Sequence, residues 1–173
     1  MKVADFLTLI RIILTPVLVF FLFMPIPHKQ WFAAGIFILA ALTDGLDGYV
    51  ARARNESSDF GKSFDPLADK ILIGAALISL CKLGKVNIWA VVLILGREIL
   101  ITILRSVAGK KGISVGAGIW GKIKTVTQII AIVMIILSLP GAGLILNIAV
   151  FFTVFSGLDY LIKWRVIFSS KKD

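Results

Sequence analysis

The chain has 173 residues, 58% of them hydrophobic, and its mean hydropathy is +0.97. Soluble domains usually hold about 45–50% apolar residues, so this composition excludes an ordinary soluble domain and predicts a protein that lies mostly in lipid. The formal net charge is +9. We expect these cations to set membrane topology and to contact anionic headgroups, and we expect no nucleic-acid partner. The single cysteine, Cys81, excludes a disulfide within the chain.

Long apolar segments follow one another along the chain, each close to the roughly 20 residues that cross a bilayer as a helix. Prolines close the first, a polar stretch separates the second from the third, and glycine-containing turns or loops separate the others. The first segment has no small-residue cleavage site, so we expect it to remain in the mature protein. The predicted helices are 6–24, 31–52, 63–81, 86–108, 122–139 and 144–162.

The length of these apolar runs distinguishes helices from the strands of a membrane barrel. Barrel strands alternate apolar and polar residues over about ten positions, whereas each predicted segment stays apolar for about twice that length. We therefore predict an all-α integral membrane protein with six transmembrane helices in a single domain, residues 1–173.

Lysine and arginine are distributed unequally between the two sets of helix ends. Fourteen of them fall at the set that includes both termini, and three, Lys29, Lys82 and Lys85, fall at the opposite set. The positive-inside rule then predicts a multi-pass protein of the cell (inner) membrane with both termini in the cytoplasm. Within the cytoplasmic set, Arg11, Arg54 and Lys62 are expected to contact lipid headgroups.

Four of the ten acidic residues gather at the predicted cytoplasmic ends of the second and third helices. Asp44 and Asp47 are three residues apart, and Asp65 and Asp69 are four apart, so each pair shares one helix face. A short connection joins the two helices, so the pairs can meet at similar depth. Charged groups inside membrane helices are costly and usually functional.

Four converging carboxylates repel one another unless cations or protons neutralise them. Oxygen ligands select Mg²⁺, Mn²⁺ or Ca²⁺, and the lack of histidine or cysteine nearby argues against zinc. Two ions about 3.5–4 Å apart suit displacement at phosphorus. Two alternatives are a structural ion cluster with Arg52 and Lys70, and a cation- or proton-coupled transporter. A transporter would be expected to carry broken helices and an inverted repeat, and the sequence shows neither.

The spacing of this segment resembles the signature of the CDP-alcohol phosphotransferase family. The matching residues are Asp44-x2-Asp47-Gly48-x2-Ala51-Arg52-x8-Gly61-x3-Asp65-x3-Asp69. The resemblance implies that the four aspartates bind two divalent cations, Mg²⁺ or Mn²⁺, and that Gly48, Arg52 and Gly61 hold the pyrophosphate of CDP-diacylglycerol. It also implies that Asp69 is the catalytic base and that the protein is a homodimer in contact with membrane lipids.

Later runs are similar to the phosphatidylglycerophosphate synthase branch of that family. They are 97–99, 104–105, 121–125 and Gln128. The acceptor in that branch is sn-glycerol 3-phosphate, a dianion that needs cations near the metal site, and release of CMP would accompany its attack. The candidate phosphate ligands are Arg97, Arg105, Lys122 and Lys124.

These assignments leave alternatives open. Inositol phosphate is the nearest competing acceptor, and serine and phosphatidylglycerol are others. Arg97 could instead pair with Glu98, and the two lysines could serve only as topological anchors.

Overall fold

The computed structural model describes residues 3–54, 59–110 and 119–169, with side chains described for 9–43, 70–109 and 119–162. All regular structure in these ranges is helical, which confirms the prediction of an all-α protein. The six helices are α1 (Val3–Phe23), α2 (Lys29–Arg54), α3 (Asp59–Lys82), α4 (Ile88–Lys110), α5 (Ile119–Ile136) and α6 (Ala142–Ser169).

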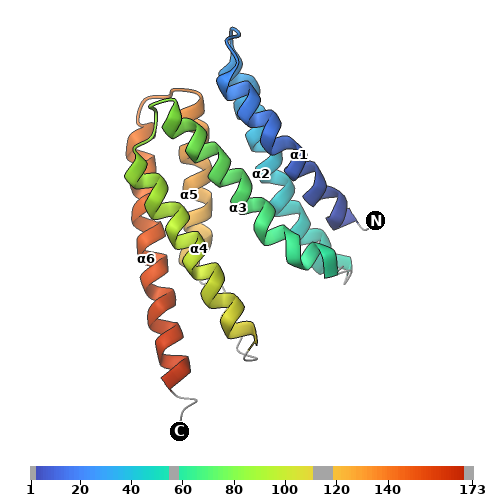
Figure 1. Ribbon diagram of the computed structural model, residues 1–173, viewed down its shortest axis with the longest axis vertical. Helices are drawn as coiled ribbons and strands as arrows, with labels where there is room; N and C mark the ends of the chain where they lie inside the picture. The colour runs from blue at the N-terminus through green and yellow to red at the C-terminus, as the bar shows by residue number, and fades with distance from the viewer. Residues whose placement is uncertain (1–2, 55–58, 111–118, 170–173) are drawn as a thin grey trace.

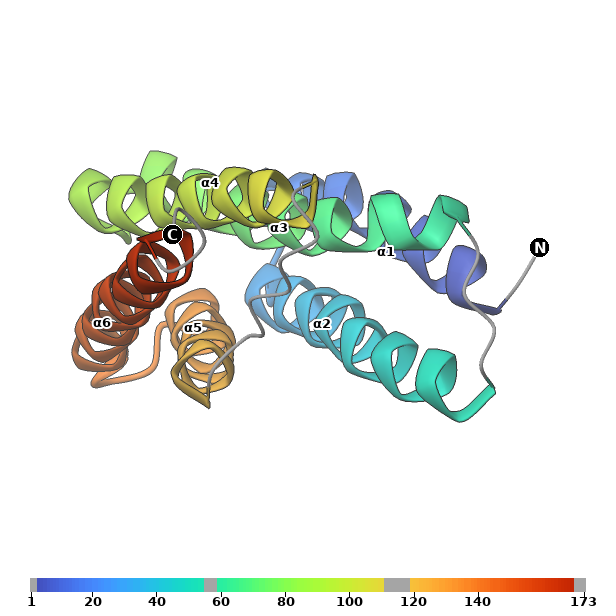
Figure 2. The same ribbon diagram turned by 90° about the horizontal axis from the view of Figure 1, so that it is seen from below.

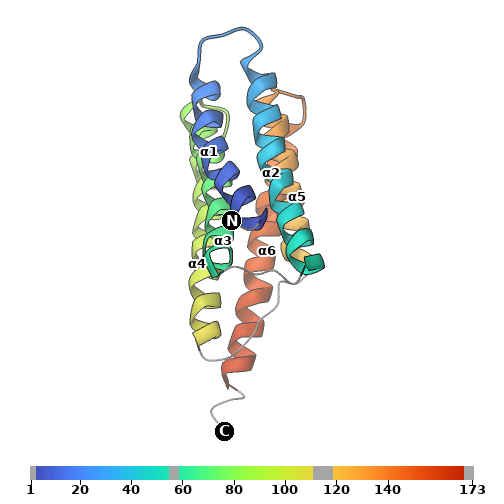
Figure 3. The same ribbon diagram turned by 90° about the vertical axis from the view of Figure 1, so that its right-hand side faces the viewer.

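Successive helices run up and down through the molecule (Figures 1 and 3). The tight turns after α1, α3 and α5 lie at one end. Toward the other end lie the beginnings of α1, α3 and α5 and the ends of α2, α4 and α6. This is the end to which the sequence assigns most of its cations. Figure 2 shows the molecule from this end. Helices α5 and α6 lie together on the left, α2 lies on the right, and α3 and α4 run along the upper side.

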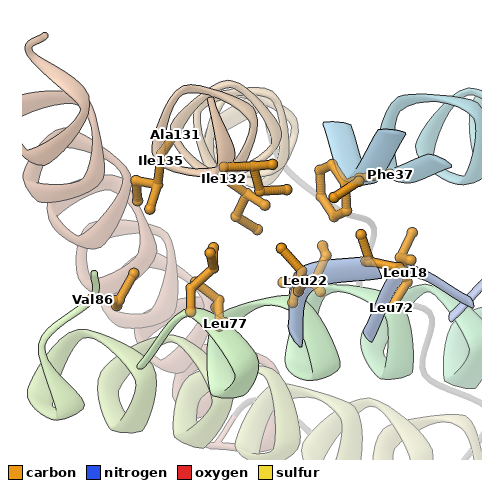
Figure 4. Packing of buried hydrophobic residues seen from close by; sticks show 14 of the residues in the cluster. Leu18, Leu22, Phe37, Leu72, Leu77, Val86, Ala131, Ile132 and Ile135 are labelled. Atoms are coloured by element: carbon orange, nitrogen blue, oxygen red, sulfur yellow. The ribbon is translucent and has the colours of Figure 1, made fainter. Parts of the chain in front are cut away.

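A buried apolar core contains residues of all six helices, and Figure 4 shows part of it. Leu18 and Phe37 are fully buried, and Leu22 follows Leu18 by four residues on the same face of α1. The other labelled core residues are Leu72, Leu77, Val86, Ala131, Ile132 and Ile135. Gly74 of α3 faces α4, since a Cβ there would lie 3.5 Å from Leu95, an ordinary van der Waals contact.

Large apolar side chains also cover the outside of the molecule. Phe20, Leu39 and Phe151 are each about 60% exposed, and soluble monomers rarely expose apolar patches of this extent. Within the described residues, Ile119–Ile136 and Ala142–Ile162 are long and apolar enough to cross a membrane, by length and composition. Two shorter apolar stretches are Leu9–Phe23 and Lys29–Thr43.

Residues with positive φ reverse the chain at the predicted turns. Gly84 (φ 71°) and Gly141 (φ 80°) adopt the left-handed conformation that glycine tolerates best. Ser138 also has a positive φ, 55°, and it ends α5 earlier than the predicted 139. Lys85 donates a hydrogen bond to Ser138 over 2.9 Å, which ties two turns together. Asn87 caps α4 by accepting a hydrogen bond from the backbone N–H of Trp89.

Candidate active site

The backbone places both aspartate pairs in helices at the cation-rich end. Asp44 and Asp47 lie in the last part of α2, and Asp65 and Asp69 lie in the first part of α3. The end of α2 and the beginning of α3 lie at the same end of the molecule (Figure 1). Because both segments are helical, the three- and four-residue spacings keep each pair on one helix face.

The side chains of the four aspartates lie outside the described residues, so their predicted convergence remains a prediction. Among the described side chains, no group of three or more histidine, cysteine or acidic residues could hold a metal ion. The donor set of the signature fits Mg²⁺ or Mn²⁺, because it supplies only carboxylate oxygens from two consecutive helices. Gly48 and Arg52 lie in α2 and Gly61 in α3, and their side-chain surroundings are likewise outside the described residues.

A buried polar cluster joins α4, α5 and α6, and we call its four residues, Arg97, Glu98, Lys124 and Ser156, the Glu98 cluster. The Glu98 carboxylate accepts hydrogen bonds from Lys124 Nζ and from Arg97 Nη1, the latter at 3.4 Å. Arg97 Nη2 donates to Ser156 Oγ over 3.1 Å. The side chains of Arg97, Glu98 and Lys124 are only 15%, 14% and 7% exposed. Two cations and one carboxylate leave this cluster with a net positive charge.

The structure brings together two of the four cations predicted to bind the acceptor phosphate. Arg97 and Lys124 meet at one carboxylate, so the pairing of Arg97 with Glu98 that the sequence left open is present. Arg105 is exposed and lies over the Tyr160 ring, with its guanidinium carbon 5.8 Å from the ring centroid. Lys122 is also exposed. Neither shares a recorded hydrogen bond or ion pair with the Glu98 cluster in the described part of the chain.

One prediction about a cation is wrong. Arg11 was expected to contact lipid headgroups, but its side chain is fully buried inside the bundle. Hydropathy alone cannot show this, because an arginine near the end of a membrane helix can extend either to the headgroups or toward a neighbouring helix. Arg54 and Lys62 were also expected to contact headgroups, and their side chains lie outside the described residues.

Hydrogen bonds continue from the Glu98 cluster into the interior between α5 and α6. Ser156 Oγ donates to the Thr153 carbonyl over 3.1 Å, and Gln128 Nε2 donates to Thr153 Oγ1 over 2.8 Å. Thr153 is fully buried and Gln128 is 1% exposed. Buried polar groups in an apolar setting need such partners, because an unpaired one is costly.

Sequence reasoning missed the buried residues of α6 near the Glu98 cluster and its hydrogen-bond network. Thr153, Ser156, Gly157 and Tyr160 are all buried on one face of the helix. Their spacing of three, four and seven residues is the repeat of a helix face. A stripe of small and polar residues at this spacing, inside an otherwise apolar span, was the signal that could have indicated them.

Comparison with known proteins assigns a family to this arrangement. The model of the CDP-alcohol phosphatidyltransferase family matches residues 1–155. A Bacillus subtilis protein named CDP-diacylglycerol–glycerol-3-phosphate 3-phosphatidyltransferase is 40% identical, with 95% of this chain and 96% of that protein aligned.

Two further relatives agree with this match. A Mycobacterium tuberculosis protein named probable phosphatidylglycerophosphate synthase is 39% identical over 92% of this chain and 80% of its own length. A Rickettsia felis protein with the same name as the Bacillus relative is 37% identical over 90% of this chain and 91% of its own length. These matches give no support to the transporter alternative. The chain belongs to the CDP-alcohol phosphatidyltransferase family, whose members are embedded in membranes.

Proposed function

We propose that this protein transfers the phosphatidyl group of CDP-diacylglycerol to sn-glycerol 3-phosphate, forming phosphatidylglycerophosphate and CMP. The proposal depends chiefly on one observation: the complete aspartate signature lies in the adjoining ends of two consecutive helices of a chain from this family. The names of the relatives indicate glycerol 3-phosphate as the acceptor. The net positive Glu98 cluster is suited to a phosphorylated acceptor.

The carboxylates of the signature would hold two divalent cations, Mg²⁺ or Mn²⁺. Asp44 and Asp47 would approach from α2, and Asp65 and Asp69 from α3. When bound, the cations would neutralise the pyrophosphate and the charge that develops on departing CMP. Four carboxylates are a suitable donor set, since two dications balance their charge.

The remaining signature residues would position CDP-diacylglycerol. Gly48 and Gly61 would let the pyrophosphate approach the helix backbones closely, because they carry no side chain. Arg52 would bind a phosphate oxygen with two parallel hydrogen bonds. The lipid tails would remain in the bilayer while the nucleotide reaches the cytoplasmic end of the bundle.

Asp69 would act as the base on the acceptor. The acceptor hydroxyl oxygen forms a bond to the lipid-bearing phosphorus, the bond from that phosphorus to the CMP phosphate oxygen breaks, and CMP leaves with the electron pair. Asp69 would take the hydroxyl proton, provided that it lies within hydrogen-bond reach of the attacking oxygen. Its position, more than its basicity, would make it effective.

The phosphate of the acceptor would bind to cations of α4 and α5. Arg97 and Lys124 meet at one carboxylate and bring two cationic side chains to this part of α4 and α5, which would attract a dianion. Arg105 and Lys122 are exposed and would complete the site from its edge. A neutral alcohol would gain little from these cations.

Release of CMP tests this proposal. Purified protein in mixed micelles with CDP-diacylglycerol, glycerol 3-phosphate and Mg²⁺ or Mn²⁺ should release CMP and form a phosphorylated lipid product. EDTA should abolish the reaction, and added Mg²⁺ should restore it. Parallel reactions with inositol phosphate, serine and phosphatidylglycerol identify the acceptor. If glycerol 3-phosphate yields no CMP, the proposal is wrong, and CMP released with another of the four acceptors identifies that acceptor instead.

We further propose that all six helices cross the cell membrane, with both termini and the active site in the cytoplasm. In a Cys81→Ala background, a cysteine at Gln30 should react with an impermeant maleimide added outside the cell, and one at Gly109 should not. The opposite labelling pattern would contradict this orientation.

We also propose that the protein is a homodimer. Light scattering should then give twice the mass of one chain after the detergent contribution is subtracted. A mass equal to one chain would contradict this proposal.

A further inference from the structure

We propose that α6 contributes two positioning residues, Gly157 and Ser156, that fix the Arg97 guanidinium for binding of the acceptor phosphate. This inference rests on the proposed function, because it assigns these residues to the acceptor half of that reaction. The family model matches only residues 1–155, so neither residue belongs to the matched segment. The contacts between α4 and α6 carry the argument.

Gly157 leaves the space in which the Arg97 side chain lies. A Cβ added at Gly157 would be 3.2 Å from Arg97 Cγ and 3.7 Å from Arg97 Nε. The first distance is tighter than ordinary van der Waals contact, so Arg97 would have to move by a few tenths of an ångström. The Arg97 stem therefore lies directly against the backbone of α6.

Ser156 holds the far end of the same side chain. Its hydroxyl donates to the Thr153 carbonyl over 3.1 Å, which leaves the oxygen as an acceptor for Arg97 Nη2, also at 3.1 Å. Ser156 is 4% exposed, so water cannot readily replace it. With Nη1 directed at Glu98, both terminal nitrogens of the planar guanidinium have fixed partners.

Fixing the guanidinium matters because a flexible arginine must be ordered each time a ligand binds. A side chain already held in place loses less conformational freedom on binding. The stem is held by the missing side chain at Gly157 and the head by Ser156 and Glu98. The phosphate would thus meet a cation whose position and orientation are set before it arrives.

Gly157→Ala tests this inference, with Gly96→Ala as the matched control. Both changes add one methyl group inside a helix, but nothing lies within 4 Å of a Cβ at Gly96. Misplacement by about 1 Å can cost on the order of 100-fold, so a few tenths of an ångström should raise KM for glycerol 3-phosphate by about 3- to 10-fold. KM for CDP-diacylglycerol should stay unchanged, and Gly96→Ala should behave as the wild type.

Two further variants separate a positioning role from a general loss of structure. Ser156→Ala should raise the same KM by a similar or smaller factor. Arg97→Ala should raise it more, and adding Gly157→Ala to Arg97→Ala should have no further effect, because Gly157 acts through Arg97. Unchanged elution in size-exclusion chromatography shows that each variant is folded.

The results that overturn the inference differ from those that overturn the proposed function. Wild-type protein that releases no CMP with glycerol 3-phosphate refutes the proposed function. Active wild type with Gly157→Ala and Ser156→Ala both indistinguishable from Gly96→Ala refutes the inference alone. Equal rises in KM for both substrates also refute it. If Gly157→Ala aggregates, Ser156→Ala decides by the same criterion.

Discussion

The Glu98 carboxylate pairs with both Arg97 and Lys124 in a buried setting, so Glu98→Gln should be strongly destabilising. At 3.4 Å and an effective dielectric constant of about 20, the gross attraction between Arg97 and Glu98 is about 5 kcal/mol. The side chains are at most 15% exposed, so solvent screens them little. Removing one partner of a buried ion pair typically costs about 3–5 kcal/mol, because the other charge stays buried without compensation.

The expected fall in unfolding free energy for Glu98→Gln is therefore about 3 kcal/mol. Adding Lys124→Gln should recover part of it, on the order of 1–2 kcal/mol, because the double variant removes one of the two cations that Glu98 pairs with. Lys124→Gln alone should cost less than Glu98→Gln, since Arg97 remains paired with Glu98.

Reversible unfolding of the protein in mixed micelles by SDS, followed by tryptophan fluorescence, measures these free energies. Glu56→Gln is a matched control, because Glu56 is the only other glutamate in the chain and the change in net charge is identical. Wild-type stability for Glu98→Gln would refute the reasoning. So would additive losses in the double variant, since the charges would then not be coupled.

Three other changes have distinct expected outcomes. Asp69→Asn should abolish turnover far more than it weakens CDP-diacylglycerol binding, measured by equilibrium dialysis with labelled substrate; loss of binding would instead make Asp69 chiefly a metal ligand. Thr153→Val should lower stability by about 1 kcal/mol by removing the hydrogen bond with Gln128, and adding Gln128→Leu should restore most of it; a further loss on SDS unfolding would contradict this account. Gly84→Ala should cost about 1–2 kcal/mol because φ is 71° there, whereas Gly143→Ala, with open space at the added Cβ, should cost little; equal losses would show that backbone strain is not the cause.

Local sequence information was sufficient to predict the helices and the family. Each apolar run is set by its own residues and by the length of a bilayer, so the number and order of helices could be predicted from hydropathy. Their bounds were less certain: α6 extends to Ser169, beyond the predicted 162. The family prediction from Asp44 to Asp69 is confirmed by the match over residues 1–155.

The candidate site was likewise only partly predictable from the sequence. The aspartates could be recognised as a set because their spacing lies within one short stretch of chain. Arg97 and Lys124 could be proposed from their charge and depth, but the sequence could not show that they share Glu98. It gave no reason to connect Arg97 with Ser156, 59 residues later in the chain.

Only the tertiary structure decided which helix faces meet. Hydropathy places a residue along the membrane normal, but packing against neighbouring helices sets the rotation and tilt of each helix. Arg11 therefore proved to be buried although its position near a helix end predicted headgroup contact. The role of Gly157 also depends on how the helices pack. The absence of a side chain at this position matters only because α4 brings Arg97 against it.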